Sequence, residues 1–118
     1  MLNDEVSAHL DSFNDRKSVC LYGVETHVCI RQTCLDLLEK NYDVHLVVDA
    51  VSSMKQHDRN VGIESMVDMG ASLITFQSLM FELLRTMEHP HFKTMLPILK
   101  DNPANPLDLH YFNAAPKL

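Results

Sequence analysis

The segment at residues 43–51, DVHLVVDAV, restricts the possible folds more than any other part of the chain. Its centre, Leu46-Val47-Val48, is continuously apolar and does not alternate with polar residues. A strand with one face in water alternates, whereas a strand covered on both faces of a parallel sheet is apolar throughout. We therefore expect this segment to be a strand inside a parallel sheet that helices cover.

The neighbouring segments alternate between helical and strand-like patterns. Residues 3–13 carry apolar side chains three and four positions apart, with Asn3 placed to cap the helix. Further strands are expected at residues 18–24 and 72–76, and further helices at residues 28–41, 57–69, 79–89 (capped by Ser78) and 91–100 (interrupted by Pro97). Gly70 is a natural helix stop. The order α-β-α-β-α-β-α is typical of an α/β protein with a parallel sheet and right-handed crossovers.

The size and charge of the chain exclude several classes of protein. The 118 residues fit one domain, which we place at residues 1–100, followed by an irregular tail at 101–118 that holds three prolines. A net charge of −6 disfavours a nucleic acid or an anionic membrane as partner, and no apolar window is long enough to span a membrane. The three glycines of the chain, Gly23, Gly62 and Gly70, are too far apart to form a GxGxxG dinucleotide site.

The chain has three cysteines, Cys20, Cys29 and Cys34. Their spacing matches no structural zinc site, and we expect neither a metal nor a cofactor. An odd count, with acids where a signal peptide needs cations, predicts reduced thiols in the cytoplasm. The ending Pro-Lys-Leu at residues 116–118 resembles the peroxisomal address Ser-Lys-Leu, so the peroxisome is the alternative location.

Cys29 lies where a strand is expected to end and a helix to begin. Ligands bind beyond the carboxyl ends of parallel strands, and Gly23 lets the chain bend there without a Cβ. Unpaired N–H groups at a helix start favour a thiolate and can hold an oxyanion. A cysteine after a strand is also a common small buried filler. The spacing alone leaves both interpretations open.

The residues around Cys29 resemble a known family. GVETHVCI, residues 23–30, resembles the G-V-x-T-x-x-C signature of isochorismatase-like cysteine hydrolases, and the similarity continues through CLDLLEKNYDVHLVVDAVSS and MGASLITFQSLMFELL. It covers roughly residues 1–100 and points in particular to the animal isochorismatase domain-containing proteins. The resemblance implies a three-layer α/β/α, Rossmann-like fold. It also implies hydrolysis of a small-molecule amide, ester or vinyl ether.

The resemblance also implies roles for individual residues. Cys29 takes the nucleophile position, and the Val24–Glu25 peptide takes the position of the family's cis bond. The backbone N–H groups of Glu25 and Cys29 would then form the oxyanion hole. The family's catalytic aspartate and lysine, and its divalent-metal ligands where present, belong to an N-terminal half that has no counterpart in this sequence. Whether the chain is an enzyme by itself is therefore uncertain.

Three residues of the sequence are candidates to replace the missing base. Asp49 follows a strand at the correct end of the sheet, although the resemblance gives it a structural role. His27 can accept a proton when neutral, but neighbours two apart at a helix start usually diverge, which favours a solvated turn histidine. Glu25 fits substrate shaping or plain exposure better than proton transfer.

The absent strands would leave the strand at residues 18–24 as an unpaired apolar edge. This predicts a protein partner or self-association through that edge. The alternatives to an enzyme are therefore a catalytically silent interaction module and a truncated or alternatively spliced fragment. For the thiols we predict that Cys29 reacts fastest, because Cys20 and Cys34 are assigned to buried strand and helix faces.

Overall fold

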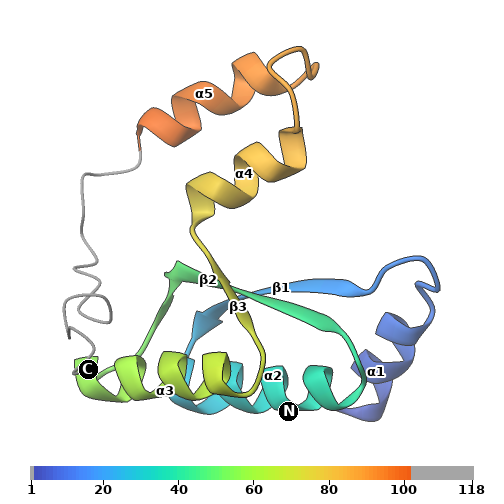
Figure 1. Cartoon of the computed structure of the whole chain (residues 1–118), viewed down its shortest axis with the longest axis vertical. Helices are drawn as coiled ribbons and strands as arrows, with labels where there is room; N and C mark the ends of the chain where they lie inside the picture. Colours follow the sequence, from blue (N-terminus) through green and yellow to red (C-terminus); the bar gives the residue numbers. More distant parts are fainter. Residues whose placement is uncertain (1, 102–118) are drawn as a thin grey trace.

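The computed structural model describes residues 2–101 (Figure 1). The expected tail therefore lies, apart from residue 101, outside the described residues, and so does the Pro-Lys-Leu ending. The elements in chain order are α1 (Asp4–Asp11), β1 (Ser18–Val24), the π-helical turn η1 (Thr26–Ile30), α2 (Arg31–Glu39), β2 (Asp43–Ser52), α3 (Gln56–Asp68), β3 (Ser72–Ile74), α4 (Phe76–Leu84) and α5 (Phe92–Lys100). Within residues 2–101, every helix is too short or too polar to cross a membrane.

The strands form one parallel sheet in the order β1-β2-β3, which confirms the predicted α/β class. Leu21 of β1 lies opposite Leu46 of β2, but the register then shifts, so that Gly23 lies opposite Val51. Figure 1 shows α1, α2 and α3 on one side of the sheet and α4 and α5 on the other. The sheet therefore has helices on both sides, as the apolar centre of β2 predicts.

The core lies between the sheet and the helices α2 and α3. Its helical members include Cys34, Leu37, Ile63 and Met66, and its β2 members include Val44, Leu46 and Val48. Arg31 adds a polar contact between the two helices, because its Nε donates to Ser65 Oγ at 2.9 Å. This packing fixes the ends of α2 and α3 that flank the candidate site.

Several helix ends match the sequence prediction, and one does not. Asn3 caps α1 by accepting a hydrogen bond from the Val6 N–H at 2.8 Å, and Gly70, with φ +113°, ends α3. The start of α4 differs, because Thr75 and not Ser78 is the N-cap. Thr75 Oγ1 accepts from the Ser78 N–H at 3.2 Å, so the helix already begins at Phe76 and β3 is correspondingly shorter.

The exposed face of β1 differs from another prediction. Cys20, expected on a buried face, is exposed, as are Tyr22 (70%) and Val24 (65%) on the same alternation. The reason is that these side chains lie on the face of β1 opposite the core, where α4 packs on β2, whereas Val19 and Leu21 point to the other face and pack against the core. In addition, β1 pairs with β2 alone in the described part of the chain, so the predicted unpaired apolar edge is present along β1.

Candidate active site

Cys29 lies on η1, the turn that connects the carboxyl end of β1 to α2. The Ile30 N–H donates to the Glu25 carbonyl at 3.1 Å, five residues back, which makes this turn wider than an α-helical one. Glu25, in extended conformation, is the N-cap. The helical path thus begins at Thr26, so that Cys29 lies inside the first turn and does not open the helix as the sequence predicted.

The backbone before this turn has an unusual conformation. Gly23 has φ +126°, a value that a residue with a Cβ rarely adopts, so glycine is required where the chain bends. The Val24–Glu25 peptide bond is cis. Thr26 and Ile30, at the two ends of the turn, are buried, whereas Cys29 between them is exposed. The turn is therefore anchored in the core at both ends and presents its thiol to solvent.

The three thiols differ in environment. Cys34 is fully buried on α2, and this burial raises the pKa of its thiol although Arg31 acts in the opposite direction. Partial desolvation raises the pKa of Cys20 as well, with a further contribution from the Glu82 carboxylate. The exposure of Cys29 argues against the buried-filler interpretation and leaves this thiol accessible to a reagent or substrate.

The side chains of η1 bind the loop after β2 and the start of α3. His27 Nδ1 lies 2.9 Å from Ser53 Oγ, and Glu25 Oε2 accepts a hydrogen bond from the Met54 N–H at 3.1 Å. His27 Nε2 lies 3.9 Å from Asp58 Oδ2. With 30% of its side chain exposed, His27 is not the solvated turn histidine expected from the sequence. Its partners, 26 and 31 residues away, explain why sequence spacing missed these contacts.

Asp49 has a structural partner. Its Oδ1 accepts a hydrogen bond from the Phe76 N–H at 2.8 Å and so connects β2 to the first residue of α4. This contact agrees with the structural role that the family resemblance implies. It also explains the early start of α4, since Asp49 satisfies an N–H group at the helix start.

Arg59 is a residue that sequence reasoning missed. Its side chain is buried on α3 and donates to the carbonyls of Val51, at 3.1 Å, and Val48. Desolvation lowers the pKa of the guanidinium, with Asp49 opposing the shift, and Nη1 has no hydrogen-bond partner among residues 2–101. The available signal was its position on the same helical face as Ile63 and Met66. Arg59 holds α3 against the carboxyl end of β2, next to the candidate site.

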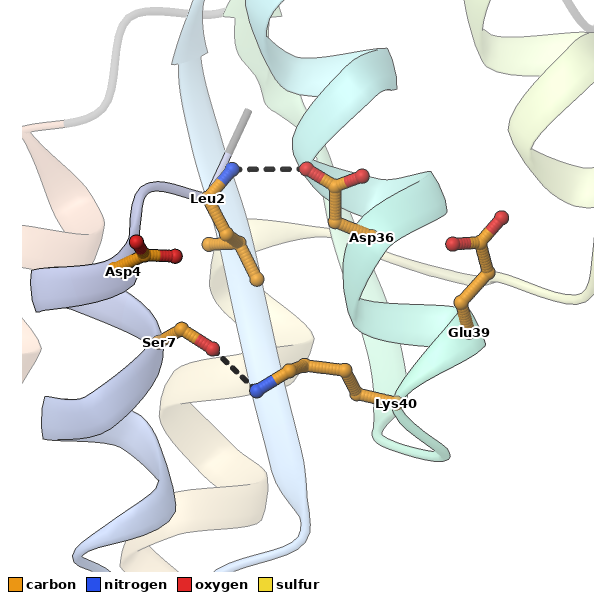
Figure 2. Close-up of a pocket in the computed structure, with 6 residues that line it drawn as sticks. All are labelled: Leu2, Asp4, Ser7, Asp36, Glu39 and Lys40. Atoms are coloured by element: carbon orange, nitrogen blue, oxygen red, sulfur yellow. Dashed lines mark hydrogen bonds between the residues drawn. The ribbon is translucent and has the colours of Figure 1, made fainter.

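Across residues 2–101, the His, Cys, Asp and Glu side chains form no group of three or more that could hold a metal ion. A cavity of about 410 Å³ lies between α1 and α2, lined by Leu2, Asp4, Ser7, Asp36, Glu39 and Lys40 (Figure 2).

The contacts at this cavity join the two helices. Asp36 accepts from the Leu2 N–H at 2.8 Å, and Lys40 donates to Ser7 and, at 2.8 Å, to Asp11. Asp36 lies in the second half of α2 and Lys40 directly follows the helix, whereas Cys29 precedes its start, so the cavity lies toward the opposite end of that helix from the thiol. It is a feature of helix packing and does not belong to the candidate site.

The parallel sheet with helices on both sides places the molecule in the α/β class, and an exposed cysteine lies on the helical turn after its first strand. Comparison with known proteins identifies its family. The isochorismatase domain model matches residues 2–78, so the chain belongs to the isochorismatase family. The secreted isochorismatase effector Isc1 of Phytophthora sojae is 45% identical over 103 residues, which cover 86% of this chain and 49% of that protein. Isochorismatase domain-containing protein 2 of Xenopus laevis is 44% identical over 101 residues, with the same coverage of 86% and 49%.

Solved structures agree with the fold. A Caenorhabditis elegans structure described as MAR1 ribonuclease has a TM-score of 0.76 and 36% identity, covering 83% of this chain and 51% of that one. A hypothetical protein from Trypanosoma cruzi has a TM-score of 0.78 and 34% identity, covering 89% and 55%. The chain spans about half the length of the curated relatives it matches.

Proposed function

We propose that this chain carries the nucleophile of a cysteine hydrolase that acts on a small-molecule amide, ester or vinyl ether. For an amide or ester, the Cys29 sulfur adds to the carbonyl carbon, and the N–H groups of Glu25 and Cys29 stabilise the resulting oxyanion. Collapse expels the amine or alcohol with a proton, and water then hydrolyses the thioester. The observation that carries the proposal is the exposed Cys29 thiol on the first turn after β1, inside the segment that the family model matches.

We propose no proton acceptor among the described residues. Asp49 is bonded to the start of α4, and His27 is bonded to Ser53. The aspartate and lysine that the family uses would come from polypeptide lying beside β1, where the sheet has a free edge. Since general-base assistance contributes about 10²–10⁴-fold, we expect this chain alone to turn over substrate slowly even if Cys29 is reactive.

The proposal is tested with two measurements on the same protein. Mass spectrometry of iodoacetamide labelling should give Cys29 the highest rate and buried Cys34 the lowest, with exposed Cys20 as the internal comparison. A panel of small amides and esters, with Cys29→Ser as control, should show activity only in the unmodified protein. Equal hydrolysis by both proteins, or labelling in which Cys29 is the slowest thiol, would overturn the assignment.

The name of the Caenorhabditis elegans structure raises RNA as a substrate. A net charge of −6 opposes the binding of a phosphate backbone, which is why we favour a small molecule. A short RNA added to the substrate panel distinguishes the two, because RNA cleavage lost in Cys29→Ser would replace the small-molecule assignment.

A second candidate function, favoured by the edge of β1, is self-association or binding of a protein partner. The exposed Tyr22 and Val24 lie on a strand with one described neighbour, an arrangement that invites strand pairing. Light scattering should show a mass that rises with concentration, and Val24→Lys should reduce it. A mass that stays that of a monomer over the whole concentration range would contradict self-association.

We also propose that the protein is cytoplasmic, on the basis of three free thiols. The peroxisomal alternative depends on residues 116–118, outside the described part. Fluorescence microscopy of a protein tagged at its N-terminus, with and without Leu118, distinguishes the two locations.

A further inference from the structure

We infer that His27 is a positioning residue, which holds the turn carrying Cys29 against the loop after β2 and against α3. This inference rests on the proposed role of Cys29. It concerns how that site is held in place, and it comes from the contacts of three chain segments: η1 itself, the loop after β2, and the first turn of α3.

Both ring nitrogens of His27 face oxygen atoms from other segments. Nδ1 lies 2.9 Å from Ser53 Oγ and 3.7 Å from Glu25 Oε2, and Nε2 lies 3.9 Å from Asp58 Oδ2. A neutral imidazole carries one N–H, so Ser53 donates to Nδ1 when the proton is on Nε2. The ring therefore contacts the loop after β2 through Nδ1, and its Nε2 faces the Asp58 carboxylate on α3.

The backbone of the same residue leaves little room for movement. A Cβ placed on Gly62 of α3 would lie 2.9 Å from His27 Cα, so the helix backbone abuts the turn at this residue. Glu25, the N-cap, is held in turn by the Met54 N–H. The turn is thus fixed at Glu25 and at His27, and His27 is two residues before Cys29. The Ile30 N–H closes the turn by donating a hydrogen bond to the Glu25 carbonyl.

The charged groups around the ring come from the turn and from α3. Glu25 and Asp58 are acidic, and His57 contacts Asp58 from the other side, with Nε2 3.2 Å from Oδ1. The side chains of His27, Glu25 and Asp58 are each about one third exposed, so each of these contacts changes an equilibrium by at most about fivefold.

The test compares two reactions of Cys29 in the full chain. Acylation by p-nitrophenyl acetate, in which the sulfur displaces p-nitrophenolate, develops an oxyanion, whereas alkylation by iodoacetamide does not. Mass spectrometry gives both rates for Cys29 and for Cys20. In the unmodified protein we expect the ratio of acylation to alkylation to be higher at Cys29 than at Cys20, because the N–H groups of Glu25 and Cys29 stabilise the oxyanion at Cys29 alone.

Variants separate positioning from general destabilisation. His27→Ala should lower the ratio at Cys29 by about threefold or more, and His27→Gln, whose amide can still bond Ser53, should keep part of it. His9→Gln on α1 is the matched control that should change nothing. An unchanged ratio in a folded His27→Ala protein would overturn the inference, whereas a ratio at Cys29 no higher than at Cys20 would overturn the proposed function itself.

Discussion

The strands β1 and β2 are both rich in apolar residues, but they have different environments. In β2, which has a neighbour on each side, Leu46, Val48 and Val51 are between 0% and 2% exposed. In β1, which has one neighbour, all seven residues are exposed or half-buried, and Tyr22 is 70% exposed. An apolar sequence therefore favours a strand, while the elements packed around that strand decide whether its side chains become part of the core. The molecule has a packed interior on the α2 and α3 side and an open boundary along β1.

The largest difference between the two strands should appear in the free energy of unfolding when one large side chain of each is truncated. Leu46→Ala should lower the free energy of unfolding by about 2–5 kcal/mol, because it leaves a cavity in the core. Tyr22→Ser should change it by less than about 0.5 kcal/mol, because the ring is in solvent. Urea denaturation at low protein concentration measures both. Similar losses in the two variants would mean that the outer side of β1 is covered in solution, which would break the comparison.

The second effect concerns how α3 is held at the carboxyl end of β2. Arg59→Met should destabilise the fold by about 2–4 kcal/mol, because the carbonyls of Val48 and Val51 lose their buried donor. Arg31→Met is the matched control, since its bond to Ser65 is only partly buried, and it should cost about 1 kcal/mol or less. Thermal melts of the two variants should therefore separate clearly, and equal melting temperatures would contradict the role given to Arg59.

The third effect is the close approach of α3 to the turn. Gly62→Ala should cost about 1–3 kcal/mol, because the new Cβ overlaps the His27 backbone and the turn must shift. Gly70→Ala meets no atom within 4 Å, so that its cost, about 1 kcal/mol, comes from the positive φ alone. Only Gly62→Ala should also change the alkylation rate of Cys29. An unchanged rate in a destabilised Gly62→Ala protein would show that the turn does not depend on α3.

The smallest effect is expected at the surface contact between α1 and α2. The hydrogen bond from Lys40 holds the pKa of Asp11 below its ordinary value. The carboxylate is stabilised in the folded state, so its contribution is present above about pH 4 and is lost as the pH falls through the folded pKa. Asp11→Asn should therefore flatten the dependence of the urea midpoint on pH between about 2.5 and 5. If the urea midpoints of the two proteins depended on pH in the same way, the contact between Lys40 and Asp11 would not contribute to stability.

Sequence reasoning predicted the features that depend on neighbours along the chain. The cap at Asn3, the stop at Gly70 and the apolar centre of β2 follow from a few adjacent residues. The exposure of Cys20 could not be predicted, because it depends on what covers β1. The start of α4 differed because Thr75 caps it and Asp49, 27 residues earlier, accepts a bond from its first residue.

The same distinction between local and distant contacts applies to the candidate site. Cys29 was found because a short continuous motif marks it, and the positive φ of Gly23 was expected at that bend. The contacts of His27 and the burial of Arg59 were not found, because their partners come from other strands and helices. A candidate reactive group can thus be proposed from consecutive residues, whereas the groups that contact its turn are found only in the fold.

The register shift between Leu21 and Gly23 has a further consequence. It divides β1 into a first part, which pairs regularly with β2, and a last part, which leads to the thiol. Because the ladder is irregular between them, the direction in which the backbone leaves the strand and enters η1 is set locally, at Gly23 with its φ of +126°, and not by the regular pairing of the residues before it.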